Sequence, residues 1–282
     1  MSKQVIIASD STCDLSPELI ERYQIKILPL VVNLGENQYR DGVDITPDRI
    51  YQYYDENGVL PKTAAVNIAD FDEFFGKQKE LGNDVVLFTI SAEMSSTFNN
   101  ARLAAQEYDN VHLVNSKNLS TGGGLLVVVA AEMVAQGKNA KEIAETCRVL
   151  TDKVDASFVI DNLEFLHKGG RCSALAAFGA NLLQLKPCIM VRDGKMLVGK
   201  KYRGKFSMTL EKYIADRIGD ASDIEIDRIF VTHAGCDAQI VDQCVKQVES
   251  LGIFKEIFIT RAGCTVSSHC GRNTLGVLFI RK

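Results

Sequence analysis

A short, uninterrupted run of apolar residues, Val85-Val86-Leu87-Phe88, most restricts the fold of this chain. The run is rich in β-branched and aromatic residues and is short enough to be a strand buried on both faces, as strands of parallel sheets are. Similar runs stand at Val5–Ala8 and Val111–Val114, and helical patterns lie between them. This alternation through residue 155 predicts a parallel sheet with helices on both faces.

The pattern changes after residue 156. Short apolar runs and helical patterns continue, but Arg192-Asp193-Gly194-Lys195 is typical of a hairpin turn and implies antiparallel pairing. We therefore expect an α/β protein of two domains. Residues 1–156 are predicted to form the N-terminal parallel-sheet domain, and residues 157–282 a C-terminal α+β domain with a mixed or antiparallel sheet. A ligand site is expected at the interface between them.

Hydroxyl side chains follow the Val85–Phe88 strand in an unusual density. Ser95, Ser96 and Thr97 lie directly before a helical pattern that begins at Phe98. Unpaired N–H groups and the helix dipole at such a helix start favour an anion, so we interpret this segment as the site of a ligand head group. The alternative is that these hydroxyls only cap the helix.

Other polar segments lie far from this one in sequence. Thr63 follows Pro61-Lys62 in a predicted loop, and His269 lies in a second predicted loop, at residues 265–273. In a doubly wound sheet, segments near strand ends are where ligands collect. An ordinary polar histidine is the alternative for His269. The segment Asp10–Asp14, after the first strand, is open to either a site role or loop and cap chemistry.

Glycines mark two further segments. Gly122–Gly124 precede a predicted apolar helix at 125–135, lack the spacing of a phosphate-binding loop, and are interpreted as a place of close helix packing. Arg171 follows two glycines that would expose its charge, and a solvated charge at a helix end is the alternative interpretation.

The nearly uncharged segment Ala174–Leu183 is predicted to be a helix that is buried or lines an apolar space.

Composition excludes several classes of protein. The net charge of -4 does not fit a nucleic-acid-binding surface. None of the eight cysteines forms a Cys-x-x-Cys pair, so we expect reduced thiols rather than a zinc or redox site. The longest apolar run, Leu125–Ala131, is too short to cross a bilayer, and no secretory signal is apparent. We expect a soluble, cytoplasmic protein.

Two chemical alternatives accompany the binding interpretation. Ser95 with His269 suggests a small hydrolase or acyltransferase, although no Gly-x-Ser-x-Gly segment surrounds the serine. Cys264, His269 and Cys270 suggest a metal or redox site, although no fourth ligand follows at a recognised spacing.

Taken together, the chain resembles the DegV family of bacterial fatty-acid-binding proteins. The matching segments run in order along nearly the whole chain: Asp10-Ser11-Thr12-Cys13-Asp14-Leu15, Lys62-Thr63, Ile90-Ser91 with Ser95-Ser96-Thr97, Leu163-Glu164-Phe165-Leu166 with Lys168-Gly169-Gly170-Arg171, Leu185-Lys186-Pro187 with Asp193-Gly194-Lys195, His269, and Leu275-Gly276-Val277. The chain departs from the usual family pattern after Thr63, at Ser96 and around His269.

The resemblance implies a non-catalytic carrier that holds one long-chain fatty acid. Its carboxylate would be bound by Thr63, Ser95 and His269, and its acyl chain would lie in an apolar tunnel lined in part by Ala174–Leu183. Arg171 matches an arginine on the surface that faces a separate fatty acid kinase. That partner would supply ATP and magnesium, so the carrier itself needs no cofactor. The full predicted set of ligand-binding residues is Thr63, Ser95, Ser96, Thr97, Ser268 and His269.

Overall fold

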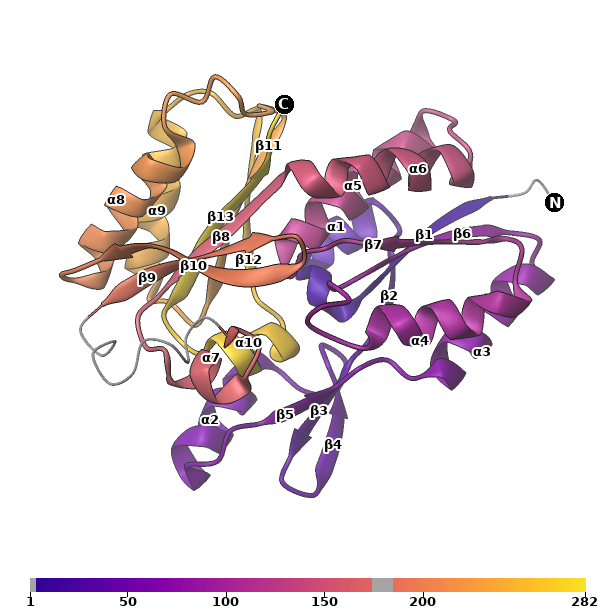
Figure 1. The fold of residues 1–282 in the computed structure, drawn as a ribbon, viewed down its shortest axis with the longest axis horizontal. Coiled ribbons are helices and arrows are strands. Elements are labelled where there is room, and N and C mark those ends of the chain that lie inside the picture. The colour runs from indigo at the N-terminus through magenta and orange to yellow at the C-terminus, as the bar shows by residue number, and fades with distance from the viewer. Residues whose placement is uncertain (1–3, 174–184) are drawn as a thin grey trace.

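The computed structural model describes residues 4–173 and 185–282. The predicted helix Ala174–Leu183 therefore lies outside the described residues. Within these two ranges the chain forms sheets of four, six and three strands with helices packed against them (Figure 1). The α/β fold class predicted from the sequence is confirmed.

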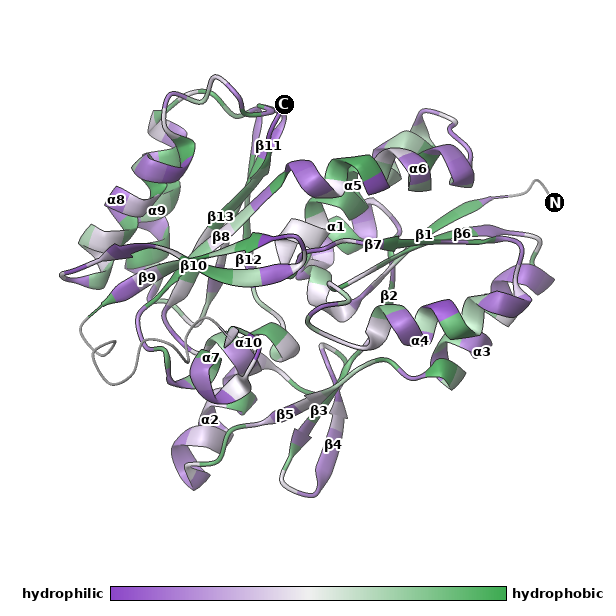
Figure 2. Ribbon diagram, viewed as in Figure 1, coloured by the Kyte–Doolittle hydropathy of each residue, from purple (hydrophilic) through white to green (hydrophobic). Residues whose placement is uncertain are grey.

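The N-terminal sheet has four strands in the order β2-β1-β6-β7, and all neighbouring strands are parallel. Its strands are β1 Val5–Asp10, β2 Lys26–Leu28, β6 Asp84–Thr89 and β7 Val111–Asn115. Side chains of β6 alternate between two cores, because Val85 and Leu87 pack on one face and Val86 and Phe88 on the other. Figure 2 shows β1 and β6 as largely hydrophobic strands between the helices. The predicted parallel sheet is confirmed.

Helices cover both faces of this sheet. On one face lie α3 Ile68–Glu80 and α4 Thr97–Ala104, and on the other α1 Pro17–Arg22, α5 Thr121–Ala135 and α6 Ala140–Leu150 (Figure 1). Single 3₁₀ turns occur at Ser11–Cys13, Ala105–Glu107 and Thr151–Lys153. The start of α1 follows its sequence signal, since Ser16 Oγ accepts the N–H of Leu19 and Pro17 occupies the first helical position.

The helix α5 begins at Thr121, four residues before the predicted start, and therefore contains the three glycines. A Cβ on Gly124 would lie 2.7 Å from the carbonyl oxygen of Cys13, and one on Gly122 would lie 2.9 Å from Asn118 Oδ1. Only glycine allows these approaches. The interpretation of this segment as a place of close helix packing is confirmed.

The C-terminal sheet has six strands in the order β10-β9-β8-β13-β11-β12, and only β11 and β12 pair in parallel. Its strands are β8 Val154–Ile160, β9 Lys186–Arg192, β10 Lys195–Tyr202, β11 Arg228–Ala234, β12 Glu256–Arg261 and β13 Thr274–Ile280. The helices α8 Phe206–Ile218 and α9 Ala238–Ser250 cover one face. The predicted Asp-Gly hairpin joins β9 and β10, so the mixed sheet is confirmed.

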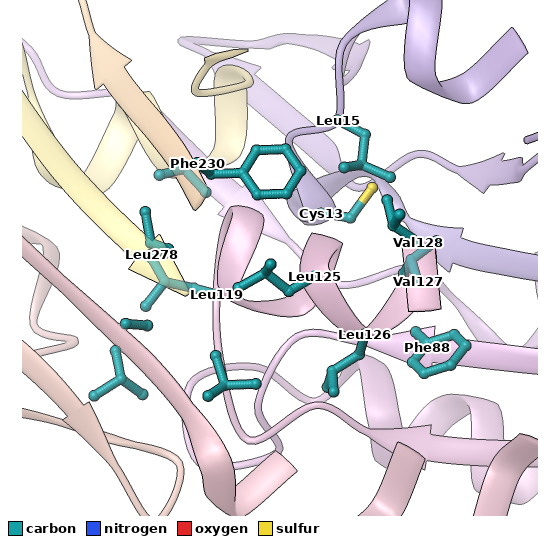
Figure 3. Packing of buried hydrophobic residues seen from close by; sticks show 14 of the residues in the cluster. Cys13, Leu15, Phe88, Leu119, Leu125, Leu126, Val127, Val128, Phe230 and Leu278 are labelled. Atoms are coloured by element: carbon teal, nitrogen blue, oxygen red, sulfur yellow. The ribbon is translucent and has the colours of Figure 1, made fainter. Parts of the chain in front are cut away.

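The other face of this sheet packs toward the N-terminal part of the chain. Phe230 and Leu278, from β11 and β13, belong to the same buried cluster as Leu119 and Leu125 beside and within α5 (Figure 3). One apolar core therefore joins the two larger sheets. Strand β8 starts at Val154 rather than Ser157, and the division into domains at residues 156 and 157 stays a prediction.

The sequence predicts a strand over Ile25–Asn33 and a turn at Gly35-Glu36-Asn37 that leads the chain back toward Tyr39. The structure contains this turn between β3 Val31–Leu34 and β4 Asn37–Arg40, which with β5 Lys62–Ala64 form a small antiparallel sheet in the order β4-β3-β5. The single strand is wrong, because β2 ends at Leu28 in the parallel sheet and β3 starts at Val31 in the small one. The prediction of a loop at Thr63 is also wrong, because Thr63 pairs with Val32.

Three helices pack around this small sheet at the lower end of Figure 1. They are α2 Pro47–Asn57, α7 Glu164–Gly169 and α10 Cys264–Cys270. Val32 and Leu34 from the sheet share a buried cluster with Tyr51 of α2, Phe165 of α7 and Cys264 of α10. Segments from both ends of the chain thus meet here, next to the loop that follows β6.

Candidate ligand-binding site

A cavity of about 630 Å³ lies where α10, β5, β10 and the loop between β6 and α4 meet. This volume falls within the range of about 300–1,000 Å³ typical of small-molecule sites. Five residues singled out from the sequence line it: Thr63, Ser95, Ser96, Arg171 and His269. Thr97 and Ser268 do not line it, although the sequence placed them in the same predicted set.

The polar centre of the cavity is a contact between two elements that are distant in sequence. Thr63 Oγ1 lies 2.8 Å from His269 Nε2, across 206 positions of the chain. Pairing of β5 with β3 fixes Thr63, and the last turn of α10 fixes His269. Gly169 packs against the Nδ1 side of the imidazole. The approach is so close that a Cβ added to Gly169 would lie 2.7 Å from His269 Nδ1.

The imidazole of His269 is uncharged at neutral pH. Burial, with a smaller contribution from the nearby Arg171 cation, lowers its pKa to about 4. Its Nδ1 has no hydrogen-bond partner among the described residues. With the ring proton on Nε2, His269 donates to Thr63 Oγ1, and the Thr63 hydroxyl proton stays free for an anionic ligand.

Ser95 presents a second hydroxyl to the cavity. Its Oγ lies 2.9 Å from Thr97 Oγ1 and accepts the N–H of Thr97 at 3.3 Å. Thr97 is fully buried behind it. Ser95 therefore both caps the start of α4 and lines the cavity. The interpretation of this cluster as helix caps is compatible with its interpretation as a head-group site. The first residue before the helix, Ser96, makes no capping bond with its side chain.

His269 lies in a helix, and the prediction of a polar loop at 265–273 is wrong in this part. Two carboxylates from the N-terminal part of the chain bind the N–H groups at the start of α10. Asp41 accepts the N–H groups of Cys264 and Thr265 at 2.7 and 3.0 Å, and Asp14 accepts that of Gly263 at 2.8 Å. A helix of small polar residues is stabilised by caps that its own sequence does not contain.

The Asp10–Asp14 segment connects both walls of the cavity. Asp10 accepts the N–H of Ile90, where the loop to Ser95 begins, at 2.7 Å, while Asp14 holds α10. Burial raises the pKa of Asp10 to about 6 and raises that of Asp14 well above its ordinary value. The segment thus acts through loop and cap chemistry, and neither carboxylate lines the cavity.

Two further cavities adjoin the first. One, of about 500 Å³, shares Thr63, Arg171 and His269 with it and adds Lys62 and Lys168; Ser268 also lines this one, and no carboxylate does among the described residues. The other is narrow and almost wholly apolar, with a volume of about 30 Å³. It shares three lining residues with the main cavity: Leu119, Val266 and Cys270.

Sequence reasoning missed three residues around this site. Lys62, Gly169 and Thr265 each contact His269 or share its cavities. Lys62 and Gly169 stand beside residues that the sequence did single out, which is the one signal that could have found them. Thr265 lies four positions before His269, a spacing that has meaning only once the segment is known to be helical.

The family assignment comes from the whole chain. A family model described as the uncharacterised DegV proteins matches residues 4–282. The chain belongs to the DegV family. Among curated relatives, a DegV domain-containing protein of Clostridium acetobutylicum is 31% identical over 282 residues and 99% of either chain. One from Staphylococcus aureus is 31% identical over the whole of both chains.

Solved structures agree with this DegV assignment. The chain is similar to a fatty-acid-binding DegV family protein from Thermus thermophilus, with a TM-score of 0.87, 28% identity, and 99% and 100% of the two chains covered. It is also similar to a stearic-acid-binding protein from Eubacterium ventriosum, with a TM-score of 0.84, 29% identity and 99% of both chains covered. The resemblance seen in the sequence is confirmed.

The geometry of this DegV chain bears on the two chemical alternatives. A serine hydrolase needs its nucleophile hydrogen-bonded to a base, whereas here Ser95 contacts Thr97 and His269 contacts Thr63. Within residues 4–173 and 185–282, no group of three or more His, Cys, Asp or Glu side chains is placed to hold a metal ion. Over the same ranges, no helix has the length and apolarity to cross a membrane.

Proposed function

We propose that this chain is a non-catalytic carrier of one long-chain fatty acid. The carboxylate binds at Thr63 and Ser95, with His269 behind Thr63, and the acyl chain extends into the apolar side of the cavity. The observation that carries this proposal is the Thr63–His269 pair on the wall of a cavity of about 630 Å³. Relatives of 28% and 29% identity with the same fold are described as fatty-acid-binding and stearic-acid-binding proteins.

The two hydroxyls are well arranged to bind a carboxylate. With the ring proton of His269 on Nε2, and with the Thr97 hydroxyl as donor to Ser95 Oγ, Thr63 and Ser95 would each keep a proton to donate to the ligand. Hydrogen bonds to an ionised group are stronger than those between neutral groups. Because these two donors are neutral, they hold the carboxylate without forming an ion pair with it.

The acyl chain gains its free energy from burial. Each CH₂ removed from water contributes about 0.8 kcal/mol, so a chain of about 16 carbons gains on the order of 10 kcal/mol before the costs of association. Leu119, Val266 and Cys270 lead from the main cavity into the narrow apolar one, which supports a path for the tail toward the core. The predicted lining by Ala174–Leu183 lies outside the described residues.

A kinase partner belongs to the same proposal. The cavity lined by Lys62, Lys168 and Arg171 adjoins the Thr63–His269 pair. Lys168 is paired with Glu164, so Lys62 and Arg171 are the cations that would attract a phosphate-bearing group there. The catalytic subunit of a fatty acid kinase would bind there, near Arg171, and supply ATP and magnesium for acyl-phosphate formation. Such a carrier works in the cytoplasm beside its ATP-dependent partner and needs no cofactor of its own.

Native mass spectrometry of the freshly purified protein tests the proposal first. We expect one acyl chain per protomer, identified after solvent extraction. The delipidated protein is then titrated with palmitic acid. Thr63→Ala and Ser95→Ala should each weaken binding roughly 10- to 100-fold, because a hydrogen bond to a charged group contributes about 1.5–3 kcal/mol. His269→Ala should weaken it too, since Thr63 loses its donor.

A matched control is Ser250→Ala, which removes an exposed hydroxyl that bonds only the carbonyl of Gln247. This variant should bind palmitic acid like the wild type. An empty protein that takes up no added fatty acid would contradict the proposal. Ester hydrolysis by the purified protein that disappears in Ser95→Ala would instead identify it as a hydrolase.

A further inference from the structure

The helix α10 carries three hydroxyl side chains, and they differ in how they are satisfied. Ser267 Oγ donates to the carbonyl of Ala262 at 3.1 Å, and Ser268 Oγ donates to that of Cys264 at 2.7 Å. Thr265 Oγ1 has no hydrogen-bond partner among the described residues, although the residue is only 4% exposed. Buried hydroxyls without a partner are uncommon and costly, so the Thr265 hydroxyl is available to a group beyond the described residues.

The position of Thr265 supplies a place for that partner. Thr265 lines the same cavity as Thr63, Ser95 and His269. It lies four positions before His269, so both side chains lie on one face of α10. Its backbone N–H is bound by Asp41 at 3.0 Å, which fixes the first turn of the helix. The hydroxyl is therefore held in place beside the predicted head group before any ligand arrives.

We propose that Thr265 is a further ligand-binding residue, whose hydroxyl donates to the carboxylate of the bound fatty acid. This inference rests on the proposed function. An ionised carboxylate has about four acceptor sites. Thr63 and Ser95 occupy two of them, and Thr265 takes a third from the side of α10.

The test compares two substitutions at Thr265 in the delipidated full-length protein. Thr265→Val keeps the shape and removes the hydroxyl, and Thr265→Ser keeps the hydroxyl. Each is titrated with palmitic acid and with methyl palmitate, which has the same acyl chain and no carboxylate. Thr265→Val should bind palmitic acid about tenfold or more weakly, and the ester as the wild type does. Thr265→Ser should bind palmitic acid within about threefold of the wild type.

The melting temperature of the empty protein provides a readout that does not depend on a ligand. Because the hydroxyl has no partner within residues 4–173 and 185–282, Thr265→Val should not lower that temperature. A large decrease would show a structural role and overturn the inference. If Thr265→Val binds palmitic acid as tightly as the wild type or more tightly, while Thr63→Ala weakens binding, the role of Thr265 is overturned and the proposed function stands. A wild-type protein that binds neither compound would overturn the proposed function and this inference with it.

Discussion

The uncharged state of His269 yields a prediction that isolates one side chain. His269→Gln keeps an N–H group within reach of Thr63 and removes the titratable ring. The folded pKa of about 4 lies below the ordinary value of 6.5, so between these values the unfolded chain binds more protons at this position than the folded chain. The wild type therefore loses stability relative to His269→Gln as the pH falls.

The size of this loss follows from the pKa difference. Each unit corresponds to about 1.4 kcal/mol, so the difference in unfolding free energy between wild type and variant changes by up to about 3 kcal/mol from pH 7 to pH 4. Comparison with the variant is needed because Asp10 acts in the opposite direction. Its pKa is raised to about 6, so its contribution favours the folded state as the pH falls.

Urea unfolding at half-unit steps of pH measures the free energies, and NMR of the imidazole nitrogens measures the pKa itself. We expect the difference between the two proteins to be constant above pH 7 and to fall steadily below 6.5. A difference that stays flat across this range, or an imidazole that titrates near 6.5, would refute the lowered pKa of His269.

Two further pairs of variants test the packing and the caps. Gly124→Ala places a Cβ against a backbone carbonyl and should lower the unfolding free energy by about 1–3 kcal/mol. In Gly123→Ala the added Cβ would meet no atom closer than 3.5 Å, so the unfolding free energy should stay unchanged or rise by up to about 1 kcal/mol. Equal effects of Gly124→Ala and Gly123→Ala would contradict close packing at Gly124. Asp41→Asn weakens the cap of α10 and should lower the unfolding free energy by about 1–2 kcal/mol in the same urea titrations. Asp44→Asn, at an exposed carboxylate, should have little effect.

Much of the fold was predictable because its signals are local. The buried runs of the parallel sheet and the Asp193-Gly194 hairpin each lie within a few residues, and the structure forms them as predicted. The small sheet gave a weaker signal. The turn at Gly35-Glu36-Asn37 is local, but strand β4 reads Asn-Gln-Tyr-Arg without an apolar alternation, and Figure 2 shows it as mostly hydrophilic. The pairing of β3 with β5 joins residues about 30 positions apart, for which the sequence has no local signal.

The site was less predictable because its contacts are long-range. Local pattern nominated Ser95 and placed Thr63 and His269 in polar segments, but only the family resemblance assigned all three to one carboxylate. No spacing rule predicts a contact across 206 positions. Likewise, α10 looked like a loop because its capping carboxylates, Asp14 and Asp41, come from more than 220 positions away. Without the helix, the relation between Thr265 and His269 could not be seen.

The separation of Thr63 from His269 also determines when the protein can first be loaded during its synthesis. Chains grow from the N-terminus, and N-terminal parts begin to fold first. The parallel sheet can therefore form on the ribosome before α10 exists. Until the chain has been made through residue 270, the nascent protein has only one side of the proposed head-group site. On the proposed function, a fatty acid would find no complete site on a partly made chain, and loading would follow only after translation has passed this point.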